Sequence, residues 1–347
     1  MKNQKITQKV LTVLLTMLIS VPALSACTQS GSGNGGNQTA KYEYSTQIEI
    51  IDVKYGSLAV SEISCNGEYI YVLCTTLFAA DEERENVQLI VILDMNQNVV
   101  REIYYQADIP DVRLVQVKAA TDGSYWTQEL SKMPGSQDQF LRQYDEFGNV
   151  LLTIRPGDLL EGSNYGFTIA AVDKLGRAYV AVDSGRNKIG CDRLALIDQE
   201  GKLVCSWDDF STSLWVTILD DGTPIVREWG GGPNVIEPYG FNNLYKISED
   251  GGAVLLTDLN DQEKEYGVRF DMEMFSGAGQ EIFLEHGFTL YRFSLEDLTV
   301  KTVADWSELE RTNVYTPYLH ELYVVSENLM YGFTSNRTTI TMITFEK

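Results

Sequence analysis

After residue 40 the chain shows short runs of β-branched and aromatic residues, broken by turn formers, and hardly any helical periodicity. This pattern predicts β-strands joined by tight turns. One motif recurs: a strand ends on an acidic residue or a serine, a short turn follows, and another strand begins. The strand-ending residues are Asp94, Asp145, Asp198, Ser248 and Ser294, which lie 51, 53, 50 and 46 residues apart.

A second turn lies upstream of each of these, and a sixth follows the last. These turns lie near Asn66, Asp122, Asp173, Asp221, Gly277 and Ser326. Two hairpins in about fifty residues make four strands, which is the unit of a β-propeller blade. The sixth unit supplies only three strands, and a spare strand at Gln47–Val53 precedes the first unit.

We therefore predict an all-β fold, a six-bladed β-propeller. In it, Gln47–Val53 pairs beside Thr338–Phe345 and completes the last blade. Closing the ring in this way removes the strand edges that an open arrangement would expose. A seven-bladed ring with one degenerate unit and a two-sheet sandwich are the alternative folds.

The turn motifs support a resemblance. Asp122-Gly-Ser-Tyr-Trp126, residues 140–154 and residues 194–204 resemble six-bladed propellers of the NHL and gluconolactonase-like kind. More narrowly, the chain is similar to bacterial lipoproteins that place such a propeller before an ABC-transporter solute-binding domain. Because this chain ends at Lys347, where that domain would begin, we do not expect it to transport solute by itself.

The same resemblance raises the question of calcium, which gluconolactonase-like propellers hold on Glu, Asn and Asp side chains at the channel mouth. No residue-by-residue match for that set exists here. Glu129, Asn187 and Glu285 are the conceivable ligands, and carboxylates are abundant in an acidic chain. We therefore expect no resident cofactor or metal.

The first residues have the form of an export signal. Three lysines precede an apolar run of 15 residues, Val10–Leu24, which is shorter than the roughly 20 residues of a spanning helix. This arrangement predicts a signal peptide over residues 1–26. Leu24-Ser-Ala-Cys27 resembles the lipobox of bacterial lipoproteins, which implies a lipidated Cys27; an ordinary thiol is the alternative.

Domain organisation and location follow from this reading. Residues 27–45 form the lipidated cysteine and a glycine-rich flexible tether, and residues 46–347 form one propeller domain. The expected location is the outer face of the cytoplasmic membrane, with the lipid anchor as the membrane contact.

Composition narrows the range of partners. The chain has 49 acidic and 27 basic side chains, a net charge of −22, so its surface repels phosphate backbones. We expect no nucleic-acid partner and a monomeric protein.

Four cysteines follow the anchor, and export permits disulfides. On the expected hairpins Cys74 lies opposite Ala59, and Cys205 lies opposite Leu194. Neither neighbouring pair, Cys65 with Cys74 or Cys191 with Cys205, is therefore in register. Free thiols are favoured, and the cross-pairs stay open.

Candidate binding residues come from the connections between the second and third strands of the blades, which are long in four units and gather on one face. Such loops commonly carry function. The ligand-binding candidates are Trp126, Glu129, Arg186, Asn187, Arg227, Trp229 and Glu285. Core packing of Trp126 and surface pairing of the arginines are the alternative interpretations.

Catalytic chemistry finds little support in the sequence, and we assign no catalytic residues. Only two histidines occur, and neither zinc-ligand spacing nor a Gly-x-Ser-x-Gly elbow is present. The expected function is a non-catalytic binding module for a sugar, a peptide or an envelope component. A scaffold for an envelope or transporter complex and a calcium-dependent propeller hydrolase or lyase are the alternatives.

Overall fold

The computed structural model describes residues 42–50, 52–53, 56–76, 87–105, 112–131, 139–159, 166–183, 191, 193–208, 210, 213–230, 240–270, 273–307, 318–336 and 339–347. The predicted signal peptide, Cys27, most of the tether, Arg186 and Asn187 lie outside these residues. Residues 40–347 form one compact unit. No helix in the described part of the chain combines the length and the apolar character needed to cross a membrane.

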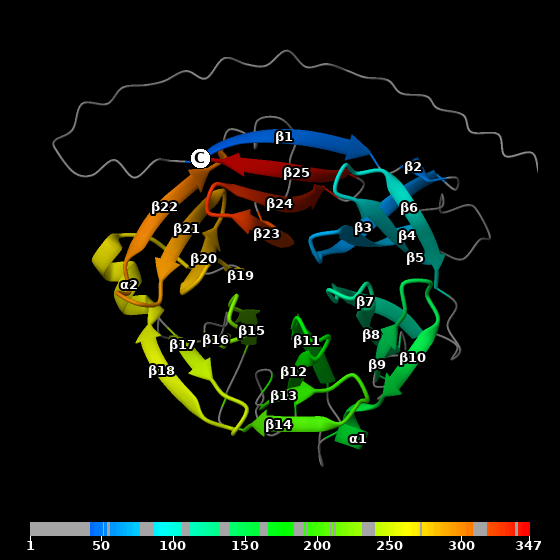
Figure 1. Cartoon of the computed structure of the whole chain (residues 1–347), viewed down its shortest axis with the longest axis horizontal. Coiled ribbons are helices and arrows are strands. Elements are labelled where there is room, and N and C mark those ends of the chain that lie inside the picture. The colour runs from blue at the N-terminus through cyan, green and yellow to red at the C-terminus, as the bar shows by residue number, and fades with distance from the viewer. Residues whose placement is uncertain are drawn as a thin grey trace, which may run out of the picture. The chain divides into compact units, whose positions relative to one another are not determined.

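Six antiparallel sheets stand around a common axis, which confirms the predicted six-bladed β-propeller (Figure 1). We name the strands of each blade A to D from the axis outward. Blade 1 comprises β3 (Gly56–Cys65), β4 (Tyr69–Thr76), β5 (Gln88–Asp94) and β6 (Val99–Tyr104). Blade 2 comprises β7 (Val112–Ala119), β8 (Tyr125–Ser131), β9 (Gln139–Tyr144) and β10 (Val150–Ile154). Blade 3 comprises β11 (Gly166–Val172), β12 (Ala178–Asp183), β13 (Arg193–Ile197) and β14 (Leu203–Trp207).

The other three blades repeat this order. Blade 4 comprises β15 (Ser213–Ile218), β16 (Pro224–Trp229), β17 (Asn242–Ile247) and β18 (Ala253–Asp258). Blade 5 comprises β19 (Met274–Ser276), β20 (Glu281–His286), β21 (Thr289–Ser294) and β22 (Val300–Asp305). Blade 6 comprises β23 (Glu321–Ser326), β24 (Leu329–Asn336), β25 (Thr339–Glu346) and, as its outermost strand, β1 (Glu43–Ile50).

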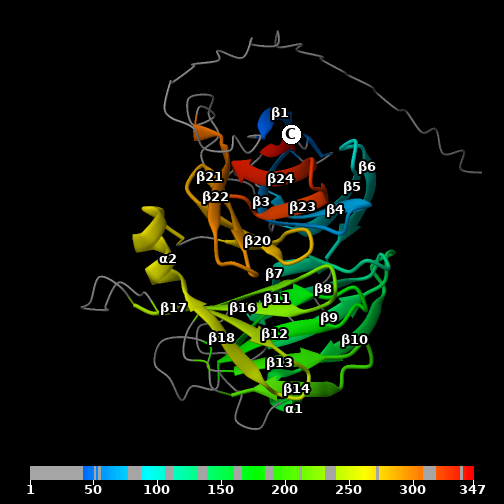
Figure 2. The same ribbon diagram turned by 60° about the vertical axis from the view of Figure 1, so that its left-hand side comes forward.

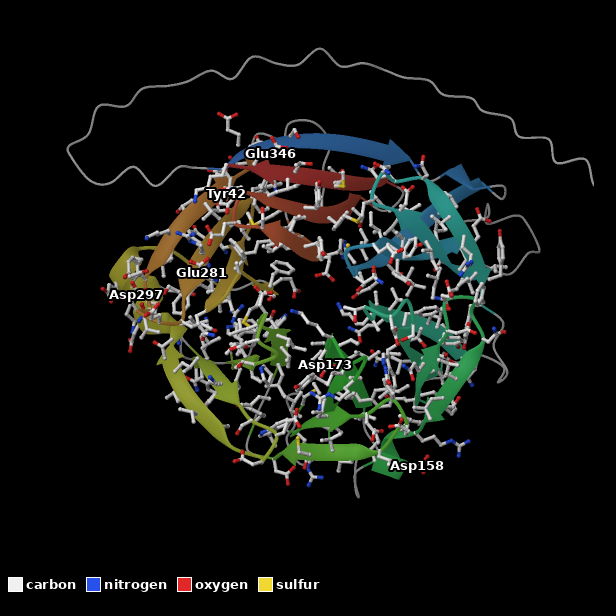
Figure 3. The ribbon with its side chains drawn as sticks, viewed as in Figure 1. Tyr42, Asp158, Asp173, Glu281, Asp297 and Glu346 are labelled. Carbon is white, nitrogen blue, oxygen red and sulfur yellow. The ribbon has the colours of Figure 1, made fainter. Side chains whose placement is uncertain are left out.

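The leading strand closes the ring as predicted. β1 pairs with β25 in antiparallel register, with Gln47 opposite Met342. The predicted strand Gln47–Val53 is divided, because β2 (Asp52–Val53) pairs with β3 of blade 1 instead. Just before β1, buried Tyr42 donates its backbone N–H to the Val303 carbonyl of blade 5 and its hydroxyl to the Glu327 carbonyl of blade 6 (Figure 3). The entry of the chain is thus fastened to two blades.

The recurring turn motif has a local cause. Asp145 ends strand C of blade 2, and its carboxylate accepts hydrogen bonds from the N–H groups of Phe147 (2.9 Å) and Asn149 (2.8 Å). Between them Gly148 adopts a φ of 87°, which is the left-handed residue of a three-residue hairpin loop with a bulge. Asp94 and Asp198 accept the equivalent pairs of hydrogen bonds.

The hydrophobic core is divided among the interfaces between blades. Alternate side chains of a strand face opposite neighbours: Tyr125 of β8 packs toward blade 1, whereas Trp126 packs toward blade 3. Six buried clusters result, one at each interface of the ring. Apolar burial therefore holds neighbouring blades together.

Two helices interrupt the all-β pattern. α1 (Pro156–Leu159) is a single turn, and α2 (Leu259–Tyr266) lies outside blade 4 against β17 and β18 (Figure 2). Asp258 caps α2 by accepting a hydrogen bond from the Asn260 N–H, and Gly267 ends it with a φ of 66°. The sequence reading did not anticipate this helix.

No disulfide joins the four described cysteines, which agrees with the favoured interpretation. Cys74 lies opposite Val60, one residue from the expected Ala59. Cys205 lies opposite Leu196 instead of Leu194, because a bulge shifts the register of that hairpin.

Candidate functional site

Two of the predicted ligand-binding residues connect neighbouring blades. In blade 4 the carbonyl of Thr223 closes the A–B turn, and Arg227 follows it by four residues. In blade 5 the carbonyl of Glu281 closes the A–B turn, and Glu285 follows it by four residues. Gln128 lies at the same distance from Ser124 in blade 2. All three reach the segment that leads into the next blade, so this strand-B position fastens one blade to the next.

Arg227 is fully buried, with an exposed fraction of 0%. Its Nε donates to the Asn242 side-chain oxygen (2.8 Å), and its Nη2 donates to the Phe270 carbonyl ahead of blade 5. Gln128 similarly donates to the Phe167 carbonyl at the start of blade 3. The guanidinium also lies 5.1 Å from the centre of the Trp215 ring. Arg227 is therefore turned into the protein, where Asn242 and Phe270 engage its guanidinium.

Glu285 is also fully buried and accepts a hydrogen bond from the Leu319 N–H at 3.0 Å, ahead of blade 6. Burial raises the pKa of its carboxyl well above the ordinary value, although the Leu319 N–H opposes the rise. Glu129 lies in blade 2 and accepts hydrogen bonds from the hydroxyls of Tyr105 and Tyr144. The structure does not bring Glu129 and Glu285 together as shared ligands of one ion.

The two predicted tryptophans lie in different surroundings. Trp126 is fully buried between blades 2 and 3, and its indole N–H donates to the Gly176 carbonyl at the A–B turn of blade 3 (3.0 Å). It packs in the hydrophobic core between these two blades. Trp229 is partly exposed, and its ring meets Trp215 edge-on at 6.1 Å.

A charged cluster at the ring axis is the stronger candidate site. We call it the axial cluster, and it consists of Glu62, Lys118, Trp215, Glu273, His320 and Glu321. Side chains of the A strands project toward the axis (Figure 3). Glu62, Trp215 and Glu273 each lie four residues before the first residue of their A–B turns, Asn66, Leu219 and Gly277, and therefore stand at one level of the ring.

Contacts inside the axial cluster join several blades. Lys118 Nζ of blade 2 lies 3.1 Å from Glu62 Oε1 of blade 1, and these side chains are 21% and 20% exposed. Glu321 of blade 6 accepts hydrogen bonds from the Ser64 hydroxyl (3.5 Å) and from the Cys65 N–H. The Trp215 side chain hydrogen-bonds Glu273 of blade 5. The partial exposure of the ion pair shows that solvent reaches the axis here.

The electrostatics of the axial cluster are coupled across the ring. Burial alone would lower the pKa of Lys118, but the charges of Glu62, Glu321 and Glu273 outweigh it and raise that pKa. Burial raises the pKa of Glu321 to about 7 and also raises that of Glu273, against the opposing charge of Lys118. Burial lowers the pKa of His320. The single positive charge of Lys118 thus interacts with the carboxylates of Glu62, Glu273 and Glu321.

This arrangement suits recognition of a polar group. The carboxylates accept hydrogen bonds, the ammonium donates them, and the Trp215 ring offers a flat apolar surface. No group of three or more His, Cys, Asp or Glu residues in the described part of the chain is arranged to hold a metal ion. In the described contacts Glu62 pairs with Lys118, Glu321 accepts from Ser64, and Glu273 accepts from Trp215.

Sequence reasoning missed the whole axial cluster. Its members come from five blades and share no local motif. A usable signal was nevertheless present: strand A is the innermost strand of a propeller blade, and charged residues such as Glu62 and Lys118 interrupt strands that are otherwise largely apolar. Once the blades were assigned, these charges could have been placed near the axis.

Comparisons with known proteins show similarity of fold. No family model matches the chain, and no curated protein matches it. Among solved structures, the chain is similar to the β-propeller domain of the Trilobed protease from Pyrococcus furiosus, with 10% identity and a TM-score of 0.48, over 82% of this chain and 79% of that one. It is also similar to the soluble aldose sugar dehydrogenase from Escherichia coli, with 8% identity and a TM-score of 0.49, over 87% and 99% of the two chains. PorZ from Porphyromonas gingivalis shares 12% identity with a TM-score of 0.43, over 85% of this chain and 34% of that one.

Proposed function

We propose that the protein is an exported lipoprotein, anchored through Cys27 on the outer face of the cytoplasmic membrane, whose propeller binds a small polar ligand at the axial cluster without transforming it. The ligand is a sugar, a peptide or another envelope component. The observation that carries this proposal is the partly exposed group of one ammonium and three carboxylates at the axis.

The energetic argument concerns the cost of these charges. Moving ionised groups out of bulk water costs several kcal/mol per ion, and apolar replacements of similar volume are often as stable or more stable. The ring itself does not require charge at this level, since blade 4 supplies Trp215 there. A binding role accounts for charges that the fold could do without.

The chemistry of the axial cluster indicates what a ligand should carry. Carboxylates outnumber the ammonium, so amine or hydroxyl donors are favoured over anions. The Trp215 ring can stack on the apolar face of a sugar or on a peptide side chain. A short peptide with a free amine and an amino sugar both meet these requirements.

Calorimetric titration of the detergent-purified full chain with cell-wall sugars, oligosaccharides and short peptides tests the proposal. We expect one class to bind, and Lys118→Met and Glu62→Gln each to weaken binding by about tenfold or more. Lys174→Met is the matched control, because Lys174 lies in an A–B turn with its side chain 62% exposed. Absence of binding across all classes, or equal affinity in all variants, would contradict the proposal.

A scaffold role is the second candidate, and one observation favours it. Strand D of blades 1 to 4 carries an exposed apolar pair within its first three residues, repeated around the rim: Val99 and Val100, Val150 and Leu151, Leu203 and Val204, Val254 and Leu255. Apolar groups repeated on a surface can mark a protein contact. Crosslinking in intact cells should then recover an envelope protein, and Leu151→Asp with Leu255→Asp should abolish its recovery.

A further inference from the structure

A cavity lies between blades 1 and 2, and none of its lining residues belongs to the axial cluster. Its volume is about 250 Å³, and residues from both blades line it. Ile90, Leu114 and Val150 provide apolar walls, and Tyr105, Tyr125 and Tyr144 provide aromatic ones. For comparison, an apolar cavity of about 150 Å³ holds one benzene molecule, so this cavity has room for one substituted ring.

A buried carboxylate organises the polar groups of the cavity. Glu129, with an exposed fraction of 0%, accepts hydrogen bonds from the hydroxyls of Tyr105 (2.7 Å) and Tyr144 (2.8 Å). It also accepts one from Thr127 (3.3 Å) and lies 3.5 Å from Arg142 Nη1. Each hydroxyl has only one hydrogen and gives it to Glu129, so its oxygen can act only as an acceptor, and that of Tyr144 already accepts from Arg142.

The charge in this region is balanced. Arg142 neutralises Glu129, and the three hydroxyls spread the remaining negative charge. An anionic ligand would meet the carboxylate, whereas a cationic one would meet the guanidinium. The cavity therefore favours an uncharged ligand with hydroxyl groups that can donate to the tyrosine and threonine oxygens.

Tyr125 provides an independent indication. Its ring stacks on Tyr144, with centroids 5.2 Å apart and planes 7° apart, and the residue is only 1% exposed. Among the described residues no group hydrogen-bonds its hydroxyl, although the hydroxyl of the neighbouring Tyr71 donates to the Gly123 carbonyl at 2.9 Å. Tyr125 lines the cavity, so a ligand there can hydrogen-bond to its hydroxyl.

We propose that this cavity is a second binding site, which takes a small uncharged six-membered ring carrying hydroxyl groups. The ring packs against the tyrosine rings, and its hydroxyls bond to Tyr125 and to the oxygens around Glu129. A pyranose and a phenol share this chemistry. The site is independent of the axial cluster and of its proposed role.

Ligand-detected NMR and calorimetry on the full chain test the inference, with glucose, galactose and N-acetylglucosamine in one arm and phenol and 4-hydroxybenzyl alcohol in the other. We expect one arm to bind. Tyr125→Phe, which keeps the stacked ring and removes the hydroxyl, should weaken binding about tenfold. Val150→Trp, which fills the cavity, should abolish it.

Two controls separate this site from structural effects and from the axial cluster. Tyr71→Phe changes the neighbouring tyrosine, which does not line the cavity, and should bind as the unaltered protein does. Lys118→Met should also bind normally. If none of the sugars or phenols bound, or if Tyr125→Phe bound as tightly as the unaltered protein, the inference would be overturned. Binding that is lost in Lys118→Met but retained in Val150→Trp would also overturn it.

Discussion

Glu321 gives the axial cluster a marked pH response. Burial raises its pKa from an ordinary 4.5 to about 7, although Lys118 and the Cys65 N–H oppose the rise. Because the folded-state pKa is the higher one, the folded protein holds this proton more tightly than the unfolded chain does. The resulting stabilisation is complete below a pH of 4.5 and is lost as the pH rises through about 7.

We therefore expect Glu321→Gln to lose less stability than the unaltered protein as the pH rises from about 5 to about 8. A glutamine cannot ionise. The difference in unfolding free energy between Glu321→Gln and the unaltered protein should therefore change by roughly 1–3 kcal/mol over this pH range. Denaturant unfolding at a series of pH values measures it. Glu346→Gln, at an exposed position of β25, is the matched control. Parallel pH curves for the unaltered protein and Glu321→Gln would contradict the raised pKa.

Glu285 allows a sharper test of how blades are fastened. Its carboxyl has a strongly raised pKa and accepts a hydrogen bond from the Leu319 N–H. Glu285→Gln keeps that acceptor without ionising, so its stability should equal or exceed that of the unaltered protein, increasingly so as the pH rises. Glu285→Leu leaves the buried N–H without a partner and should cost about 1–3 kcal/mol of unfolding free energy.

Thermal and denaturant unfolding of the two Glu285 variants decides the matter. The comparison is informative because both substitutions remove the charge and only one removes the hydrogen bond. If Gln and Leu proved equally destabilising, the fastening of blade 5 to blade 6 would not depend on this acceptor.

At the scale of elements, β1 closes the ring. Deleting residues 42–50 should expose the edge of β25, remove the Tyr42 contacts and lower the melting temperature by roughly 10 °C or more, with aggregation. Deleting residues 32–40, a glycine-rich stretch of equal length, should leave the melting temperature unchanged. Calorimetry and light scattering give the readout, and similar behaviour of both deletions would show that β1 is dispensable.

Much of the fold could be predicted because turn chemistry is local. Asp145 and Gly148 form their hairpin loop through contacts within five residues, so their spacing alone reveals the blade period. The sequence does not predict the helix α2, because eight residues are too few to show a clear helical periodicity of hydrophobic positions. Its markers were only the capping Asp258 and the terminating Gly267.

The candidate site was less predictable because it is assembled from several blades. The contacts of Lys118 with Glu62 and Glu273 depend on how the six sheets meet at the axis. These residues belong to different blades, so no local stretch of sequence contains such a contact. Arg227 is a candidate because it borders a long loop, and Glu285 because it is a conceivable calcium ligand; both choices rest on polar character. That character serves contacts between blades, which a pattern along the chain does not distinguish from contacts with a ligand.

For the whole molecule, the proposed lipid anchor can be tested directly. Cys27→Ala should abolish incorporation of labelled fatty acid and move the protein from the membrane fraction to the soluble fraction, because two acyl chains are what hold such proteins firmly. Cys205→Ala, which removes another thiol, should leave both properties unchanged. Membrane retention of Cys27→Ala would contradict lipid attachment at this residue.

The position of Tyr42 beside Glu327 has a consequence for orientation. Glu327 belongs to an A–B turn, so the chain enters the ring on the side of the short turns. In a protein anchored through Cys27, as proposed, the link to the lipid would join the propeller at this turn face. The opposite face, on which the B strands end and the C strands begin, would carry no link to the membrane.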